Sequence, residues 1–227
     1  PRSLQISVPA PAVLDATFEA MACGIQLCLI MSERVPRLDT CKILHRAGQA
    51  GCTVIGPNTL GLIRPGIAKL GTIGGRLDNV QRSFMPGRVA ILSRSGGMTT
   101  EIASFLTSHG IGQCLAVGVG GDPMVGSNFT DLIRQLEDDP TTDAVVIYGE
   151  PGGTAEEQLA EHLQKHGTRL RINAFLSGQF VDDIVNALAA SDKAEEEEDE
   201  VDSTRIDYAA TMEQAYDNLN KMLGDGG

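Results

Sequence analysis

The chain has 227 residues, of which 42% are hydrophobic, so it is long and apolar enough to fill the cores of one large domain or two ordinary ones. Its formal net charge of −12 disfavours a nucleic-acid-binding protein, which would need a basic face, and −7 of this charge falls in the acidic run Asp192–Asp202. No apolar stretch reaches the roughly 20 residues that span a bilayer, and no signal-peptide pattern opens the chain, so the sequence indicates neither a membrane-spanning nor a secreted protein.

Apolar runs alternate with amphipathic stretches from the start of the chain, which is the pattern of parallel βα units. In the first part we predict strands near Leu4–Val8, Gln26–Met31 and Thr53–Ile55, and helices near Val13–Ala22 and Leu38–Ala47. These elements correspond to half of a doubly wound sheet. We therefore predict a partial Rossmann-like domain over residues 1–66.

A segment rich in glycine and proline, Gly56–Gly87, follows the third predicted strand. This composition is typical of turns and connections. We place the domain boundary within it, with residues 67–87 as the connector, and assign no helix or strand to the segment.

The second part, residues 88–183, is more regular, and its strands begin every 25 to 30 residues, as successive right-handed βαβ crossovers require. We predict strands at Arg88–Ser93, Gln113–Val119, Asp143–Tyr148 and Arg171–Leu176, separated by helices near Thr99–Ser108, Phe129–Asp138 and Ala155–His166. The pattern predicts an α/β domain with a parallel sheet.

Residues 184–227 form a C-terminal extension of different character: a short apolar helix ending near Ala190, the acidic run, and a last helix from about Ile206 to Leu223. The last helix carries an apolar stripe, and Gly224 can end it. The stripe comprises Tyr208, Met212, Ala215, Tyr216, Leu219, Met222 and Leu223. Because the acidic run repels itself, we hypothesise that the extension is a docking arm held by a basic surface of a partner subunit.

The strongest local motif is Val89–Glu101, an apolar strand that turns through Ser95, Gly96 and Gly97 into a helix. Backbone N–H groups at a helix start lack partners within the helix, the helix dipole favours negative charge there, and glycine permits close approach. The motif therefore predicts a site for a phosphate or carboxylate. The alternative is an ordinary βα turn with Ser95 as helix cap.

Further turns follow the other predicted strands. Gly118–Pro123 and Gly149–Gly153 belong to the edge at which open α/β sheets bind ligands, which favours a binding site over structural turns. Glu150 could orient an imidazole or act as an acid or base, or could instead cap the next helix. In the first part, Met31–Pro36 and Ile55–Gly61 also follow strands, but neither has the G-x-G-x-x-G spacing of a dinucleotide site.

The histidines and cysteines show no spacing typical of metal sites, so we predict no metal site. The histidines fall on predicted helices or their ends, where surface or capping roles are expected: His45, His109, His162 and His166. The cysteines are odd in number and are expected to be reduced: Cys23, Cys28, Cys41, Cys52 and Cys114.

Taken together, four strings resemble the succinyl-CoA synthetase alpha-subunit family and the wider nucleotide-forming acyl-CoA ligases, over about Leu4 to Asp182: Ile55–Gly61, Arg88–Glu101, Gly118–Pro123 and Gly149–Gly153. The resemblance implies a CoA-binding domain, a flavodoxin-like ligase domain, and a beta-type partner subunit that carries the nucleotide and magnesium. In that family a histidine is phosphorylated, the phosphoryl group passes to the acid, and CoA displaces it as a thioester. The resemblance also implies an intracellular location, in the cytoplasm or mitochondrial matrix, and a role in the tricarboxylic acid cycle.

The resemblance also assigns roles to single residues. Ser95, Gly96 and Gly97 would hold the phosphoryl group, and Glu150 would hydrogen-bond the phosphorylated histidine. Thr100 stands where the family usually has a substrate-contacting tyrosine, which leaves the identity of the acid open. The CoA site would be lined by Met31, Ser32, Glu33, Asn58 and Thr59.

The sequence departs from the family pattern in two places. It opens at Pro1, past the family's first strand and Gly-rich CoA loop, and the family's Gly-His-Ala-Gly loop does not follow Phe180–Asp183. No histidine occurs after His166. We therefore expect that this polypeptide alone cannot form the phosphohistidine.

Three functions follow from these observations. The first is the alpha subunit of an acid–CoA ligase, completed by further segments or another chain, as the retained Gly-rich turns favour. The second is a degenerate, non-catalytic family member that serves as a structural or interaction subunit of a larger assembly, as the absent histidine favours. The third is a sensor that binds CoA without catalysis.

Overall fold

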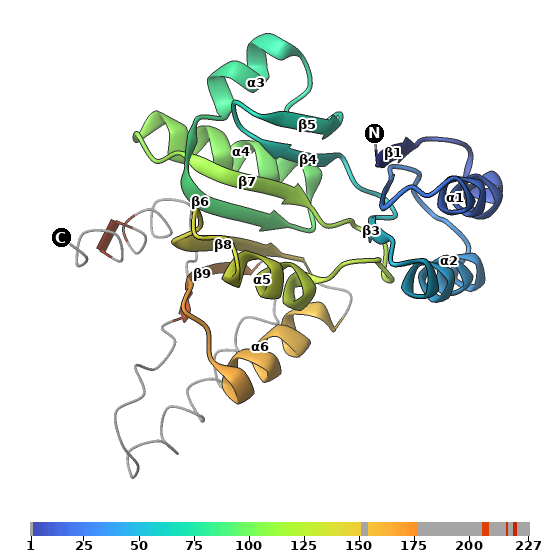
Figure 1. Cartoon of the computed structure of the whole chain (residues 1–227). Helices are drawn as coiled ribbons and strands as arrows, with labels where there is room; N and C mark the ends of the chain where they lie inside the picture. Colours follow the sequence, from blue (N-terminus) through green and yellow to red (C-terminus); the bar gives the residue numbers. More distant parts are fainter. Residues whose placement is uncertain (1, 151–153, 177–205, 209–216, 218–219, 222–227) are drawn as a thin grey trace.

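The computed structural model describes residues 2–150, 154–176, 206–208, 217, 220 and 221, which form two β-sheets (Figure 1). The smaller sheet has the strand order β1-β2-β3, and the larger has the order β10-β9-β8-β6-β7-β4-β5. Helices cover both sheets, so the predicted α/β class is confirmed. No helix in these ranges is long and apolar enough to cross a lipid bilayer.

The smaller sheet is parallel, and its elements follow in chain order as β1 (Ser3–Ile6), the 3₁₀ helix η1 (Ala10–Ala12), α1 (Val13–Ala22), β2 (Leu27–Ile30), α2 (Arg37–Ala50) and β3 (Thr53–Ile55). Because consecutive strands are neighbours and parallel crossovers are right-handed, α1 and α2 pack together on one face. Figure 1 shows them on the side away from the larger sheet. The predicted elements are confirmed, each within three residues of its predicted ends.

The larger sheet has a parallel part whose elements are β6 (Pro86–Ser93), α4 (Gly96–Ser108), β7 (Gln113–Gly118), α5 (Phe129–Glu137), β8 (Ala144–Gly149), α6 (Ala155–His166), β9 (Arg171–Leu176) and β10 (Ile206–Tyr208). Its strand order, β7-β6-β8-β9-β10, is the 2-1-3-4-5 order of flavodoxin-like folds. The helix α4 lies on one face, and α5 and α6 lie on the other (Figure 1). The predicted flavodoxin-like domain is therefore confirmed.

A hairpin extends this sheet beyond β7 within the segment that the sequence analysis treated as a connection without elements. It comprises β4 (Gly61–Arg64) and β5 (Ala68–Gly71), and α3 (Leu77–Ser83) follows it and packs against α4. Strands of four residues carry almost no periodic signal, and β4 is fixed by antiparallel pairing with the distant β7. The region is therefore part of the larger sheet rather than a plain linker.

β10 corrects a second prediction. Ile206–Tyr208, expected to begin a helix, form a strand that runs parallel to Ile172–Ala174 of β9. The edge of β9 offers backbone groups for pairing, and this non-local pairing overrides the helical pattern. Asp217, Asn220 and Lys221 are helical, as predicted, whereas the acidic run and the rest of the extension lie outside the described residues.

The apolar core joins the two sheets. Successive residues of a strand point to opposite faces, so β2 directs Cys28 and Ile30 to the cluster under α1 and α2, and Leu29 to the other face. Leu29 and Ile55 belong to the same cluster as Ile133 of α5. The larger sheet therefore covers the face of the small sheet that has no helices of its own.

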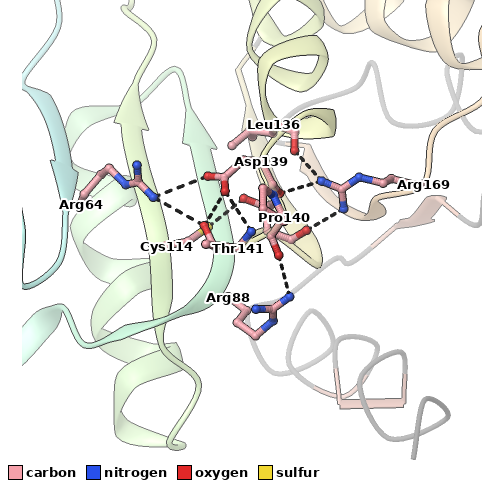
Figure 2. A network of polar contacts seen from close by, with 9 residues as sticks. Arg64, Arg88, Cys114, Leu136, Asp139, Pro140, Thr141 and Arg169 are labelled. Atoms are coloured by element: carbon pink, nitrogen blue, oxygen red, sulfur yellow. Dashed lines mark hydrogen bonds and ion pairs between the residues drawn. The ribbon is translucent and has the colours of Figure 1, made fainter.

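At the amino-terminal edge of the larger sheet, three arginines hold the loop between α5 and β8 (Figure 2). Arg88 forms a bidentate ion pair with Asp143, and Arg64 lies 3.6 Å from the carboxylate of Asp139. Arg169 donates to carbonyl groups at the end of α5 and in the loop that follows it. It donates at 2.7–2.8 Å to the carbonyl oxygens of Leu136, Glu137, Asp139 and Thr142.

Candidate functional site

The turns after β6, β7 and β8 meet at the opposite, carboxyl edge of the larger sheet. Ser93 at the end of β6 pairs with Gly118 of β7 on one side and Tyr148 of β8 on the other. In this strand order the crossovers diverge between β6 and β8, and such a switch point is where open α/β sheets bind ligands. The fold therefore brings Ser95–Gly97 and Glu150 to one end of the sheet.

The helix α4 begins at this edge without a side-chain cap. Ser95 occupies the N-cap position, as the alternative interpretation expected, but its side chain makes no capping hydrogen bond. The Ser93 hydroxyl shapes the turn instead, because it accepts from the Ser95 N–H at 3.1 Å and donates to the Ser95 carbonyl at 2.8 Å. A Cβ built on Gly97 would meet no atom within 4 Å, so the backbone there is open to a ligand.

Arg94, which the sequence reasoning misses, lies between these strand ends and is only 7% exposed. Its backbone N–H donates to the Tyr148 carbonyl at 3.1 Å. Its guanidinium donates to the carbonyls of Glu150, at 3.2 Å, and Asp122, at 3.5 Å. An arginine between two serines after an apolar strand is visible in the sequence, but its burial depends on carbonyls far along the chain.

Two glutamates lie near Arg94: the Glu150 carbonyl accepts from its guanidinium, and the charge of Arg94 acts on Glu156. Thr154 occupies the N-cap position of α6, so the alternative prediction that Glu150 caps this helix is wrong. Glu156, in the first turn of α6, has a buried Oε1 atom without a hydrogen-bond partner. Burial raises the pKa of Glu156, opposed by its own N–H, the charge of Arg94 and the Glu150 N–H. A buried carboxylate with a vacant acceptor position can receive a hydrogen bond from a ligand.

The five residues that the sequence analysis assigns to CoA lie in two adjoining loops, after β2 and after β3. The Asn58 N–H donates to the Ser32 carbonyl at 2.9 Å, which holds the loops together. Glu33 is exposed, whereas Met31 is half-buried against the cluster that both sheets share. The carboxyl edge of the small sheet therefore collects these residues.

Two of these five residues have hydroxyl groups that serve contacts within the chain. The Ser32 hydroxyl donates to the Val8 carbonyl. Thr59 is 3% exposed, and its hydroxyl donates to the Gly118 carbonyl and accepts from the Gly61 N–H at 2.9 Å. Ligand contacts in these loops would therefore come chiefly from backbone groups and the other side chains.

The loop after β7 contacts both sets of candidate residues. The Gly121 N–H donates to the Asn58 carbonyl at 3.1 Å. The Asp122 carboxylate accepts from the Arg34 N–H at 3.4 Å, while the Asp122 carbonyl accepts from Arg94. One loop thus joins the loops predicted to bind CoA to the turn predicted to bind phosphate.

The remaining candidates lie apart from this centre or close to its rim. Thr100 is half-buried, one turn into α4. As predicted, the histidines lie on helices or their ends: His45 in α2, His109 directly after α4, and His162 and His166 in α6. Across the part of the chain that the structure describes, no group of three or more His, Cys, Asp or Glu side chains could hold a metal ion.

Comparison with known proteins places these features in a family context. Residues 92–211 match the family described as CoA-ligase. The succinate–CoA ligase (ADP-forming) subunit alpha of Methanothermobacter thermautotrophicus is 44% identical over 173 residues, covering 76% of this chain and 56% of the relative. An ADP-forming sulfoacetate-CoA ligase subunit of Bilophila wadsworthia is 38% identical over 172 residues, covering 76% and 58%. The chain spans about half the length of the curated relatives it matches.

Solved structures share the fold. An ATP citrate lyase from Methanothrix soehngenii, in complex with citrate and coenzyme A, matches with a TM-score of 0.75 and 22% identity over 97% of this chain and 35% of its own. A dinucleotide-forming acetyl-coenzyme A synthetase from Ca. Korarchaeum cryptofilum matches with a TM-score of 0.66 and 20% identity, covering 95% and 47%. At these identities the likeness concerns the arrangement of helices and strands.

Proposed function

Because this chain belongs to the CoA-ligase family, we propose that it is the alpha subunit of an acid–CoA ligase of the succinyl-CoA synthetase type. The observation that carries the proposal is the set of groups at the switch point between β6 and β8. The uncapped start of α4 and the buried Arg94 lie there beside Glu150 and Glu156. A helix start and a guanidinium stabilise an anion such as an acyl phosphate.

Each residue at this edge would have a distinct role. The N–H groups and hydroxyl of Ser95–Gly97 would bind the phosphoryl group in the open space beside Gly97. Glu150 would accept a hydrogen bond from the imidazole of a phosphorylated histidine and orient it. Thr100, one turn into α4, would contact the acid.

CoA would bind the loops after β2 and β3. The donors present suit it: Asn58 offers an amide, and the exposed Arg34 offers a guanidinium for phosphate groups. Bound CoA supplies the thiol that takes the acyl group. The contacts of Gly121 and Asp122 with these loops would hold the CoA loops in place relative to the turn at Ser95–Gly97.

A beta-type partner would complete the ligase and carry the nucleotide and magnesium. Support comes from the relatives, which are named as subunits of ADP-forming ligases. Their named acids differ, succinate in one and sulfoacetate in the other, so the acid is a property of the individual ligase.

Titration calorimetry with inorganic phosphate and with CoA tests the proposal, using the purified chain alone and with a beta-type partner. We expect saturable binding of both. Gly97→Asp should abolish phosphate binding, because it places a negative side chain in the open space, while acidic residues in a first turn are tolerated by the helix. Gly48→Asp, on the exposed surface of α2, is the matched control. Absence of binding in both states would refute the proposal.

The position of the histidines favours a second candidate function, a non-catalytic subunit of a larger assembly. All four lie on helices or just after one, rather than in the turns at the switch point. We expect no ligase activity and no acid-labile label from a nucleoside triphosphate on this chain alone. An acid-labile label on the chain would overturn that expectation, and an assembled complex that binds CoA without turnover would favour the second function.

A further inference from the structure

Arg94 is placed to connect three loops at once. It follows β6, whose neighbours in the sheet are β8 and β7. Its guanidinium reaches the Glu150 carbonyl after β8 on one side and the Asp122 carbonyl after β7 on the other. One planar group therefore ties the turns that carry the proposed phosphate site, the proposed histidine-orienting carboxylate and the contact to the CoA loops.

The burial of this cation also needs a reason. A buried guanidinium is costly unless it is hydrogen-bonded and its charge is balanced. The acceptors of Arg94 in the two loops are neutral carbonyl groups, and the nearby Glu156 carboxylate senses its charge. Arg88, at the other end of the same strand, instead has a bidentate carboxylate partner and is half-exposed. Arg88 in β6 and Arg94 just after it thus have different surroundings.

We propose that Arg94 is the positioning residue of the anion site: its fork of donors fixes the loops after β7 and β8 relative to the start of α4, and its charge favours an anion there. The inference rests on the proposed function, because it assumes that Ser95–Gly97 bind an anion. Lysine cannot replace arginine in this role, since an ammonium group lacks the planar fork that reaches two fixed acceptors.

The test measures inorganic phosphate binding through the amide NMR resonances of Gly96 and Gly97, in the full chain and in three variants. Arg94→Met removes both the positive charge and the planar set of donors of the guanidinium, whereas Arg94→Lys keeps only the charge. Arg88→Met is the matched control. We expect both Arg94 variants to weaken phosphate binding by about tenfold or more, and Arg88→Met to bind like the parent chain. Circular dichroism reports whether each variant folds.

The outcomes separate the two proposals. If the parent chain binds phosphate and folded Arg94 variants bind it equally well, the role of Arg94 is refuted while the anion site stands. Full affinity in Arg94→Lys would show that charge alone suffices and would also refute positioning. If Arg94→Met does not fold, Arg94→Lys decides, and unfolding of both would make Arg94 a purely structural residue. A parent chain that binds no phosphate would overturn the anion site and this inference together.

Discussion

Gly56 lies where the chain passes from the small sheet to the larger one, and no other residue fits its conformation. Its φ is +89°, and a Cβ would collide with the Ile30 carbonyl and lie 2.9 Å from the Thr59 methyl group. We predict that Gly56→Ala lowers the free energy of unfolding by more than about 2 kcal/mol. Gly48→Ala, inside α2 with open space around it, should instead raise it by roughly 0.5–1 kcal/mol. Urea denaturation of both variants is the measurement, and equal midpoints would contradict the prediction.

The five cysteines should differ in reactivity. Burial, together with a smaller effect of Cys52, whose sulfur lies 3.7 Å away, raises the pKa of Cys28 to about 12, and burial also raises the pKa of Cys114. Because the thiolate is the nucleophile, we predict that a disulfide reagent at about pH 8 modifies Cys23 and Cys41 in the native chain. The other three should react only after denaturation. Rapid modification of all five without denaturant would show that the prediction is wrong.

At the residue scale, the sequence predicts where the candidate site lies better than what each side chain does. Ser95–Gly97 and Glu150 are recognisable because Gly-rich turns follow apolar strands. The hydrogen bond from the Thr59 hydroxyl to the Gly118 carbonyl is not recognisable from the sequence, since the two residues lie 59 positions apart. The same holds for Arg94 and Glu156, because burial of a charge is decided by the tertiary fold and not by neighbouring residues.

At the scale of elements, the ion pair between Arg88 and Asp143 should contribute to how the stability of the fold changes at low pH. The hydrogen bond from Arg88 is the main cause that lowers the pKa of Asp143 from its ordinary value of 3.8. A carboxyl group with a depressed pKa stabilises the fold above that ordinary value, and the contribution is lost as the pH falls through the lower, folded-state pKa. We predict that Asp143→Asn flattens the loss of stability below about pH 4.

Urea midpoints between about pH 2.5 and 6 measure this effect. Arg88→Gln should flatten the acid limb similarly, because it removes the same pair from the other side. An acid limb that is unchanged in both variants would show that the ion pair contributes nothing. Both groups are partly exposed, so salt should reduce the effect.

The long elements were predictable, and so were the short strands β1, β2 and β3, which belong to the repeating βα pattern, but three other short strands were not. Helices such as α1 and α6 and strands such as β9 repeat a pattern over 6 to 12 residues, and their ends agree with the prediction. The four-residue strands β4 and β5 and the three-residue strand β10 lack room for such a pattern. They exist because β7 and β9 offer edges to pair with, and an edge is a property of the assembled sheet.

At the scale of the whole molecule, β10 changes what the C-terminal extension is expected to do. The sequence suggested a docking arm, so that deleting residues 184–227 would abolish co-purification with a partner and leave the sheet folded. We now predict in addition that this deletion lowers the thermal midpoint and promotes self-association, because it exposes the β9 edge. Scanning calorimetry and size-exclusion chromatography measure both effects. A deletion of residues 209–227, which retains β10, is the control and should show neither effect.

The hydrogen bonds around Gly56, where the chain passes from the small sheet to the larger one, also bear on how the two sheets unfold. The Gly56 N–H donates to the Val119 carbonyl at 3.1 Å, and the Gly126 N–H donates back to the Gly56 carbonyl at 2.8 Å. The Ser127 hydroxyl adds a bond to the Val54 carbonyl at 2.9 Å. In native-state hydrogen exchange, amides at such a crossing are released only when the sheets part. The three-stranded sheet should therefore exchange together with the core of the larger sheet, as one cooperative unit.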